Sequence, residues 1–156
     1  CTRRTGNCCC SQNAVIEEFK KLLFHPWTNF RQAQNSPSHF SHVHYQFWEE
    51  EGEIHSAQWY DWNGEMYRER NHKLLDKGNH LELQTFRKDG TQEPSMIFQK
   101  SEDGFTGRTE EGAKNSKGDD CYSYVTITAD KFTSIDEGKT WGKTPGPFIF
   151  ERKYID

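Results

Sequence analysis

The chain has 156 residues and a mass of 18.4 kDa, which is the length of a single domain with a sizeable core. Hydrophobic residues are 32% of the chain and aromatic residues 14%, so we expect an interior lined by rings rather than filled by aliphatic side chains. The net charge of -4 argues against nucleic acid or a membrane as the main partner, because both favour a basic face. No apolar run is long enough for a transmembrane helix or the core of a signal peptide.

Cysteine is distributed unevenly along the chain. Cys1, Cys8, Cys9 and Cys10 lie in the first ten residues, and only Cys121 lies in the body. Adjacent cysteines cannot connect distant parts of a small fold, and the spacing of zinc ligands is missing. We therefore interpret residues 1–10 as a disordered or non-native leader, with a lipidated Cys1 as an open alternative, and residues 11–156 as one domain. A single thiol in the body is typical of a cytoplasmic protein.

The first predicted elements are helices. Apolar residues recur at offsets of three and four between Val15 and Leu23, which predicts an amphipathic helix that ends at His25-Pro26. A second, short helix is predicted over 28–34, with Thr28 as its N-cap.

After these helices the pattern changes to the period of two that is typical of β-strands. The predicted strands cover residues 39–50, 54–62, 65–75, 80–87, 96–100, 104–108, 121–128, 131–136 and 147–154. Asn63-Gly64 is a hairpin signal between the second and third strands, and the polar segment 109–120 is predicted to be a loop. Short strands with turns between them favour a mainly β protein, an antiparallel sandwich or barrel.

One predicted hairpin carries groups suited to binding an acid. Residues two apart share a strand face, which groups Gln58, Tyr60 and Trp62 in one strand and Arg68, Arg70 and His72 in the next. If the arginines point inward, their guanidinium groups would bind a carboxylate in a bidentate manner. The alternative is that they point outward and pair with Glu65 or Glu69.

Two further pairs share a strand face. His42 and His44 have metal-binding side chains, but no carboxylate or cysteine obviously completes a ligand set, so no metal is predicted and solvent-facing histidines are the expected arrangement. Ser134 and Asp136 form the other pair, and an inward Asp136 would accept hydrogen bonds from N–H groups of a ligand. A turn aspartate ahead of Gly138 is the alternative.

Four blocks, in order along the chain, resemble the CpcT/CpeT family of T-type phycobiliprotein lyases. They are residues 29–33 (NFRQA) with Pro37, Phe40 and His42, residues 58–61 (QWYD) with 67–70 (YRER), residues 132–138 (FTSIDEG), and Trp141-Gly142 with residues 146–152 (GPFIFER). The resemblance covers about residues 27–154, and the compact length is similar to the short versions carried by cyanophages.

The resemblance implies a lipocalin-like (calycin) antiparallel β-barrel with one or two N-terminal helices. It implies that the protein binds an open-chain tetrapyrrole, phycocyanobilin or phycoerythrobilin, as a substrate and needs no further cofactor. It also implies a lyase activity that attaches this bilin through a thioether to a cysteine of a phycobiliprotein β subunit in phycoerythrin or phycocyanin.

By matching position, the resemblance implies a pocket of Tyr60, Arg68, Arg70, Asp136 and Trp141. Gln58 and Ser134 share the strand faces of these residues and join the candidate binding set, while Asp136 and Tyr60 are the candidate catalytic residues. Two cysteines expected of the family are missing near Ser95 and Asn115, which leaves two alternatives open. These are a bilin-binding chaperone without transfer activity and a carrier of another hydrophobic acid, such as heme or a fatty acid. A homodimer also stays open.

Overall fold

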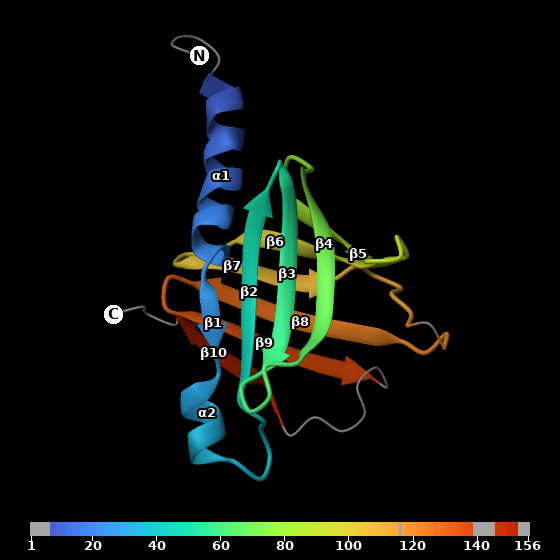
Figure 1. Ribbon diagram of the computed structural model, residues 1–156. Helices are drawn as coiled ribbons and strands as arrows, with labels where there is room; N and C mark the ends of the chain where they lie inside the picture. The colour runs from blue at the N-terminus through green and yellow to red at the C-terminus, as the bar shows by residue number, and fades with distance from the viewer. Residues whose placement is uncertain (1–6, 116, 139–145, 153–156) are drawn as a thin grey trace.

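The computed structural model describes residues 7–115, 117–138 and 146–152. Two helices, α1 (Asn7–Leu23) and α2 (Phe30–Asn35), accompany ten strands (Figure 1). The strands are β1 (Pro26–Thr28), β2 (Val43–Glu50), β3 (Glu53–Tyr60), β4 (Met66–Asp76), β5 (Leu81–Arg87), β6 (Gln92–Lys100), β7 (Gly104–Thr109), β8 (Cys121–Thr128), β9 (Lys131–Gly138) and β10 (Phe148–Arg152).

The ten strands form a closed antiparallel barrel in the order β1-β10-β9-β8-β7-β6-β5-β4-β3-β2. This confirms the expected lipocalin-like barrel with helices near the N-terminus. Neighbours in sequence pair throughout from β2 to β10, and the short β1 joins β2 to β10 and so closes the barrel. In the part of the chain that the structure describes, neither helix combines the length and the apolar character of a membrane span.

The predicted and observed elements differ mainly near the N-terminus. All nine predicted strands correspond to β2–β10, but β1 was not predicted, and Thr28 lies in β1 instead of capping α2. Asn29 occupies the N-cap position of α2 and makes no side-chain capping hydrogen bond. Its side chain instead contacts the backbone of Ser41 and Val43, at 2.9 and 2.8 Å. Helix α1 begins at Asn7, within the segment interpreted as a leader, and residues 1–6 lie outside the described residues.

Helix α1 covers one end of the barrel, which we call the α1 end (Figure 1). Phe19 is completely buried there, and its ring lies 4.8 Å from the ring of Phe98 and 5.1 Å from that of Phe105, both edge-on. Ion pairs join Lys20 to Glu49 and Glu18 to Lys100 at the rim. The helix therefore packs on the barrel interior through aromatic contacts and is held at the rim by charged groups.

The core that starts at α1 is lined by rings, as the composition predicts. Its buried members are Phe19, Leu23, Trp27, Val43, Phe47, Leu81, Leu83, Phe98, Phe105, Val125, Ile127, Phe132 and Phe150. Tyr45 lies at the limit of this cluster, with its ring 4.6 Å from Phe47 and 5.4 Å from Phe132. Beyond Tyr45, toward the end where β3 ends and β4 begins, polar side chains of β3 and β4 enter the interior beside the core residue Val43, which pairs with Tyr60. We call this the polar end.

Candidate functional site

Strand register places the predicted arginines on the interior face of the barrel. Tyr45, Gln58 and Arg68 are direct neighbours across β2, β3 and β4, and Ser56 is the neighbour of Arg70. Since Tyr45 packs on the core, its cross-strand neighbours on the same face also turn inward. The predicted sharing of one face by Arg68, Arg70 and His72 is thus present in β4.

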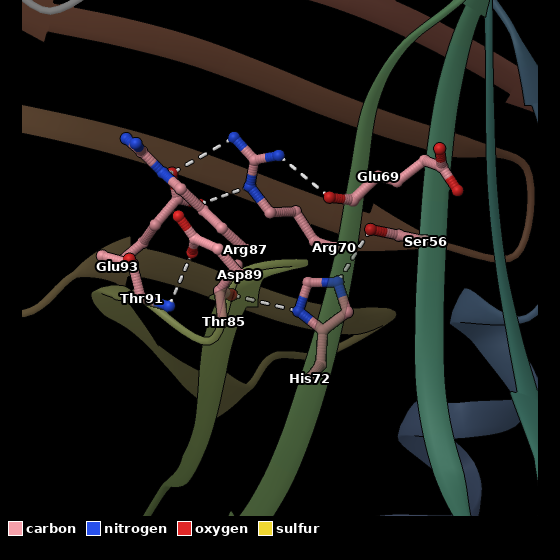
Figure 2. Close-up of polar contacts among 9 residues, drawn as sticks. All are labelled: Ser56, Glu69, Arg70, His72, Thr85, Arg87, Asp89, Thr91 and Glu93. Atoms are coloured by element: carbon pink, nitrogen blue, oxygen red, sulfur yellow. Dashed lines mark hydrogen bonds and ion pairs between the residues drawn. The ribbon is translucent and has the colours of Figure 1, made fainter.

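Arg70 forms an ion-pair network with a carboxylate that the sequence analysis did not single out. Its Nε lies 2.8 Å from Oε1 of Glu93, and Arg87 Nε lies 3.1 Å from Oε2 of the same group (Figure 2). The side chains of Arg70 and Glu93 are only 17% and 20% exposed. Arg70 contacts Glu69 through the backbone carbonyl, at 2.9 Å, and forms its ion pair with Glu93 instead of with the Glu69 carboxylate.

The network sets the charge of Glu93. Burial alone would raise the pKa of this carboxyl, but the hydrogen bonds from Arg70 and Arg87 and the nearby charge of Arg68 outweigh it, and the pKa is lowered. Glu93 is therefore ionised at neutral pH. Two guanidinium groups thus hold one carboxylate of the protein itself at this position.

His72 marks the boundary between the polar and the apolar interior. Its Nε2 lies 2.8 Å from the Ser56 hydroxyl and its Nδ1 lies 3.0 Å from the Thr85 hydroxyl (Figure 2), while its ring lies 5.6 Å from that of Phe47. Burial lowers the pKa of His72 to about 4, and the positive charge of Arg70 acts in the same direction, against the raising effect of Glu93. The imidazole is neutral at physiological pH and holds two hydroxyl groups in place.

Phenol groups stand beside the arginines. Tyr60 stacks on Tyr67 with a ring distance of 4.5 Å, and the Tyr67 hydroxyl donates a hydrogen bond of 3.0 Å to Gln58 Oε1. Burial raises the pKa of Tyr67 to about 12, although Arg68 opposes this, and burial also raises the pKa of Tyr45 against the opposing charge of Arg68. These two phenols stay protonated and can donate hydrogen bonds at neutral pH.

Asp136 and Ser134 lie on another wall of the same end. Asp136 is paired with Ser123 across β8 and β9, and Ser134 with the buried Val125, so both face the interior. The Ser123 hydroxyl donates a hydrogen bond to Asp136 Oδ1. Strand order places β9 across the closed barrel from β3 and β4, because at least three strands separate them in either direction.

The structure therefore collects six of the seven candidate residues at the polar end, on two facing walls. Gln58, Tyr60, Arg68 and Arg70 form one wall, and Ser134 and Asp136 form the other. Trp141 lies outside the described residues. The residues that sequence reasoning missed are Tyr45, Tyr67, Arg87, Glu93 and Ser123.

The structure also brings Asp61 to His42, which directly precedes β2, and to His44 in β2. Asp61 Oδ1 lies 2.8 Å from His44 Nε2, and Oδ2 lies 3.4 Å from His42 Nδ1. The sequence analysis did not pair this aspartate with them. A cavity of about 360 Å³ adjoins the group beside α2, and another of about 490 Å³ lies between β1 and the β8–β9 turn, both outside the barrel interior.

Fold and site together define a lipocalin-like barrel that is closed by a helix at one end and carries arginine, phenol and carboxylate groups inside the other. The sequence matches no family model, and no curated protein matches it. Among solved structures, it is similar to the T-type phycobiliprotein lyase CpeT from Prochlorococcus phage P-HM1. The TM-score is 0.74 at 20% identity, over 89% of this chain and 98% of the phage protein.

A second similar structure is that of the CRL protein of Arabidopsis. It has a TM-score of 0.65 at 14% identity, over 92% of this chain and 97% of the other. Both likenesses extend over nearly the whole of each chain, and at these identities they show a shared fold. The fold expected from the CpcT/CpeT resemblance is thereby confirmed.

Proposed function

We propose that this protein binds a phycobilin at the polar end of its barrel and promotes the thioether attachment of that bilin to a cysteine of a phycobiliprotein β subunit. The observation that carries the proposal is the inward-facing wall of Arg68 and Arg70 opposite the wall of Asp136. The likeness to a T-type phycobiliprotein lyase supports it. A cytoplasmic location and the absence of a further cofactor belong to the same proposal.

Each group would engage a different part of the chromophore. Arg68 and Arg70 would bind propionates, because the planar guanidinium group matches a carboxylate. Asp136 would accept hydrogen bonds from pyrrole N–H groups and favour the protonated chromophore. Tyr60 would pack against a pyrrole ring and orient it, and Trp141 takes the same role by its match to the family.

Three arginines at the polar end favour an added carboxylate. Arg68, Arg70 and Arg87 bring positive charge to this end, and a propionate would bind either by sharing Arg70 with Glu93 or by contacting Arg68. The positive charge of Arg68 acts to lower the pKa of Tyr45, Tyr67 and Glu93, so Arg68 lies near these three groups.

The reaction is an addition in which the acceptor protein supplies the nucleophile. The cysteine sulfur forms a bond to the ethylidene or vinyl carbon of the bilin, and a proton is added to the neighbouring carbon, so no oxidant or reductant is needed. The protein contributes orientation of that carbon and exclusion of water. Tyr60 is the candidate group for delivering the proton, and Asp136 is the candidate catalytic carboxylate that would take up a proton and pass it on.

The test is a transfer experiment. The bilin-loaded protein is incubated with an apo-β subunit, and the product is digested and analysed by mass spectrometry. We expect a covalent adduct at one cysteine, whereas free bilin without the protein should react unselectively. An adduct pattern identical to that of free bilin would contradict the attachment step.

The second candidate is a bilin-binding chaperone that does not catalyse transfer. The family cysteines missing near Ser95 and Asn115 favour this alternative. It predicts a bilin complex that forms but does not accelerate or direct adduct formation. A carrier of another hydrophobic acid would instead release bilin when heme or a fatty acid is added in competition.

A further inference from the structure

The cluster of His42, His44 and Asp61 lies outside the barrel interior, where β2 begins and the β3–β4 turn starts. The three residues each offer one ligand atom, and these atoms lie within 4.8 Å of one another. The backbone holds the cluster together, because the Asp61 amide donates a hydrogen bond of 3.0 Å to the His42 carbonyl. The arrangement therefore does not depend on side-chain contacts alone.

The Asp61 carboxylate spans both imidazole rings. Oδ1 is 2.8 Å from His44 Nε2, and Oδ2 is 3.4 Å from His42 Nδ1. Two imidazoles and one carboxylate are a ligand set that divalent transition-metal ions bind, at about 2.0–2.2 Å from each donor atom. The Asp61 side chain is 51% exposed, so it can rotate to let an ion enter between these atoms.

Thr28 positions His42 from the outer side. His42 Nε2 lies 2.8 Å from Thr28 Oγ1, and this hydroxyl can donate its own proton to the Val43 carbonyl at 3.5 Å. In that arrangement His42 Nε2 donates its proton to Thr28, and the lone pair of Nδ1 faces the carboxylate, where it would be available to an ion. An outer hydrogen bond of this kind is typical of metal-binding histidines.

His44 is held in a fixed orientation. The residue is only 6% exposed, and its ring stacks on Trp59 at 5.4 Å and 19°. Its Nε2 is the ring nitrogen that faces Asp61. The packing therefore keeps this nitrogen turned toward the cluster.

A cavity gives access to the cluster. Its volume is about 360 Å³, and His42 and Asp61 line it together with the aromatic side chains of Phe30, Phe40 and Trp62. An ion held by three protein ligands would keep at least one coordination position open toward this space. Three ligands with an open position are typical of metal sites that bind an exchangeable water or another donor.

We propose that His42, His44 and Asp61 form a site for a divalent transition-metal ion such as Zn²⁺, with an open position facing the cavity beside α2. The site lies on the outside of the barrel wall and does not depend on bilin binding. Loss of the metal site would therefore leave the proposed bilin function unchanged, and loss of bilin binding would leave the metal site intact.

The test is calorimetric titration of the full chain with Zn²⁺. Cys1, Cys8, Cys9 and Cys10 are first replaced by serine, because thiolates also bind zinc. We expect one ion per chain. Asp61→Asn and His42→Gln should each weaken binding at least about tenfold, since even outer partners of a metal ligand contribute ten- to hundredfold. His80→Gln, which changes a histidine outside the cluster, should bind as the reference chain does.

Co²⁺ gives an independent readout on the same serine-substituted chain. The visible absorption of Co²⁺ should report nitrogen and oxygen ligands and should lack the near-ultraviolet charge-transfer band of a thiolate. A reference chain that does not bind Zn²⁺ would overturn the proposal. Unchanged binding in Asp61→Asn or in His42→Gln would equally overturn the three-ligand site.

Discussion

Arg68 and Arg70 lie on one face of β4, but the surrounding protein engages them differently. Arg70 is committed to Glu93, whereas Arg68 lies among the phenols of Tyr45 and Tyr67. Removing Arg68 therefore tests the part of the polar end that the phenols line.

Arg68→Ala should weaken phycobilin binding roughly tenfold to a hundredfold, because a charge-assisted hydrogen bond contributes about 1.5–3 kcal/mol. The measurement is the dissociation constant from an absorbance titration. Arg108→Ala is the matched control, since Arg108 lies on the exposed outer face of β7. Equal affinity of Arg68→Ala and Arg108→Ala would remove Arg68 from the binding site.

Asp136→Asn should shift the absorbance of bound bilin to shorter wavelength or weaken it. The substitution removes the anion that would stabilise the protonated pyrrole nitrogens, while the amide can still accept a hydrogen bond from Ser123. Asp130→Asn, in the turn at the α1 end, is the control. A bound spectrum that does not change would mean that Asp136 does not contact the chromophore.

His72 should make the stability of the protein depend on pH. Its pKa is about 4 in the folded protein and about 6.5 when unfolded, so the unfolded chain binds the extra proton between these values. Stability should fall by about 3 kcal/mol as the pH falls from about 6.5 to about 4, with no further contribution from this group at lower pH. Urea unfolding across this range measures it.

His72→Gln keeps hydrogen-bonding groups near Ser56 and Thr85 but cannot gain a proton. The variant should lose most of the slope between these pH values, whereas His80→Gln should retain it. If His72→Gln kept the full slope, the acid sensitivity would belong to other groups.

At the scale of elements, α1 contributes the buried apolar side chains that close one end of the barrel. Phe19→Ala should lower the free energy of unfolding by about 3–5 kcal/mol, because the ring is completely buried between Phe98 and Phe105. Lys21→Ala, on the exposed side of the same helix, should change it by less than about 0.5 kcal/mol. Denaturant unfolding compares them, and equal values would show that α1 is not part of the cooperative core.

Strand positions could be predicted because alternating side chains and turn residues mark them locally. Gly64, for example, lies in the turn after β3 with a φ of 67°, in the region that favours glycine. The three-residue β1 could not be predicted, because it is too short to show a period. Its strand character comes from pairing with β2 and β10, which lie far away in the sequence.

Glu93 was missed because the predicted strand began at Met96, whereas β6 begins at Gln92, and a strand irregularity adds to the difference. Leu83 pairs with Met96, but Thr85 pairs with Glu93, so β6 contains one residue more than β5 over this interval. This β-bulge turns both Glu93 and Met96 toward the same face, whereas strict alternation would separate them. A bulge is set by the partner strand and leaves no reliable mark in a single sequence.

At the scale of the whole molecule, closure of the barrel decides which groups meet. Sequence analysis could place Arg68 with Arg70, and Ser134 with Asp136, since each pair follows the two-residue period of one strand. It could not place Asp61 beside His42 and His44, because that contact depends on where the β3–β4 turn folds back. Pairs within a strand are local, while contacts between strands require the complete topology.

The central claim is that the polar end of this barrel binds an open-chain tetrapyrrole. The most direct test is titration of the purified protein with phycoerythrobilin and phycocyanobilin, followed by absorbance and fluorescence. The account predicts saturable binding of one bilin per chain, with an altered long-wavelength absorption band for at least one of the two. Spectra that remain those of the free bilins at all protein concentrations would contradict it.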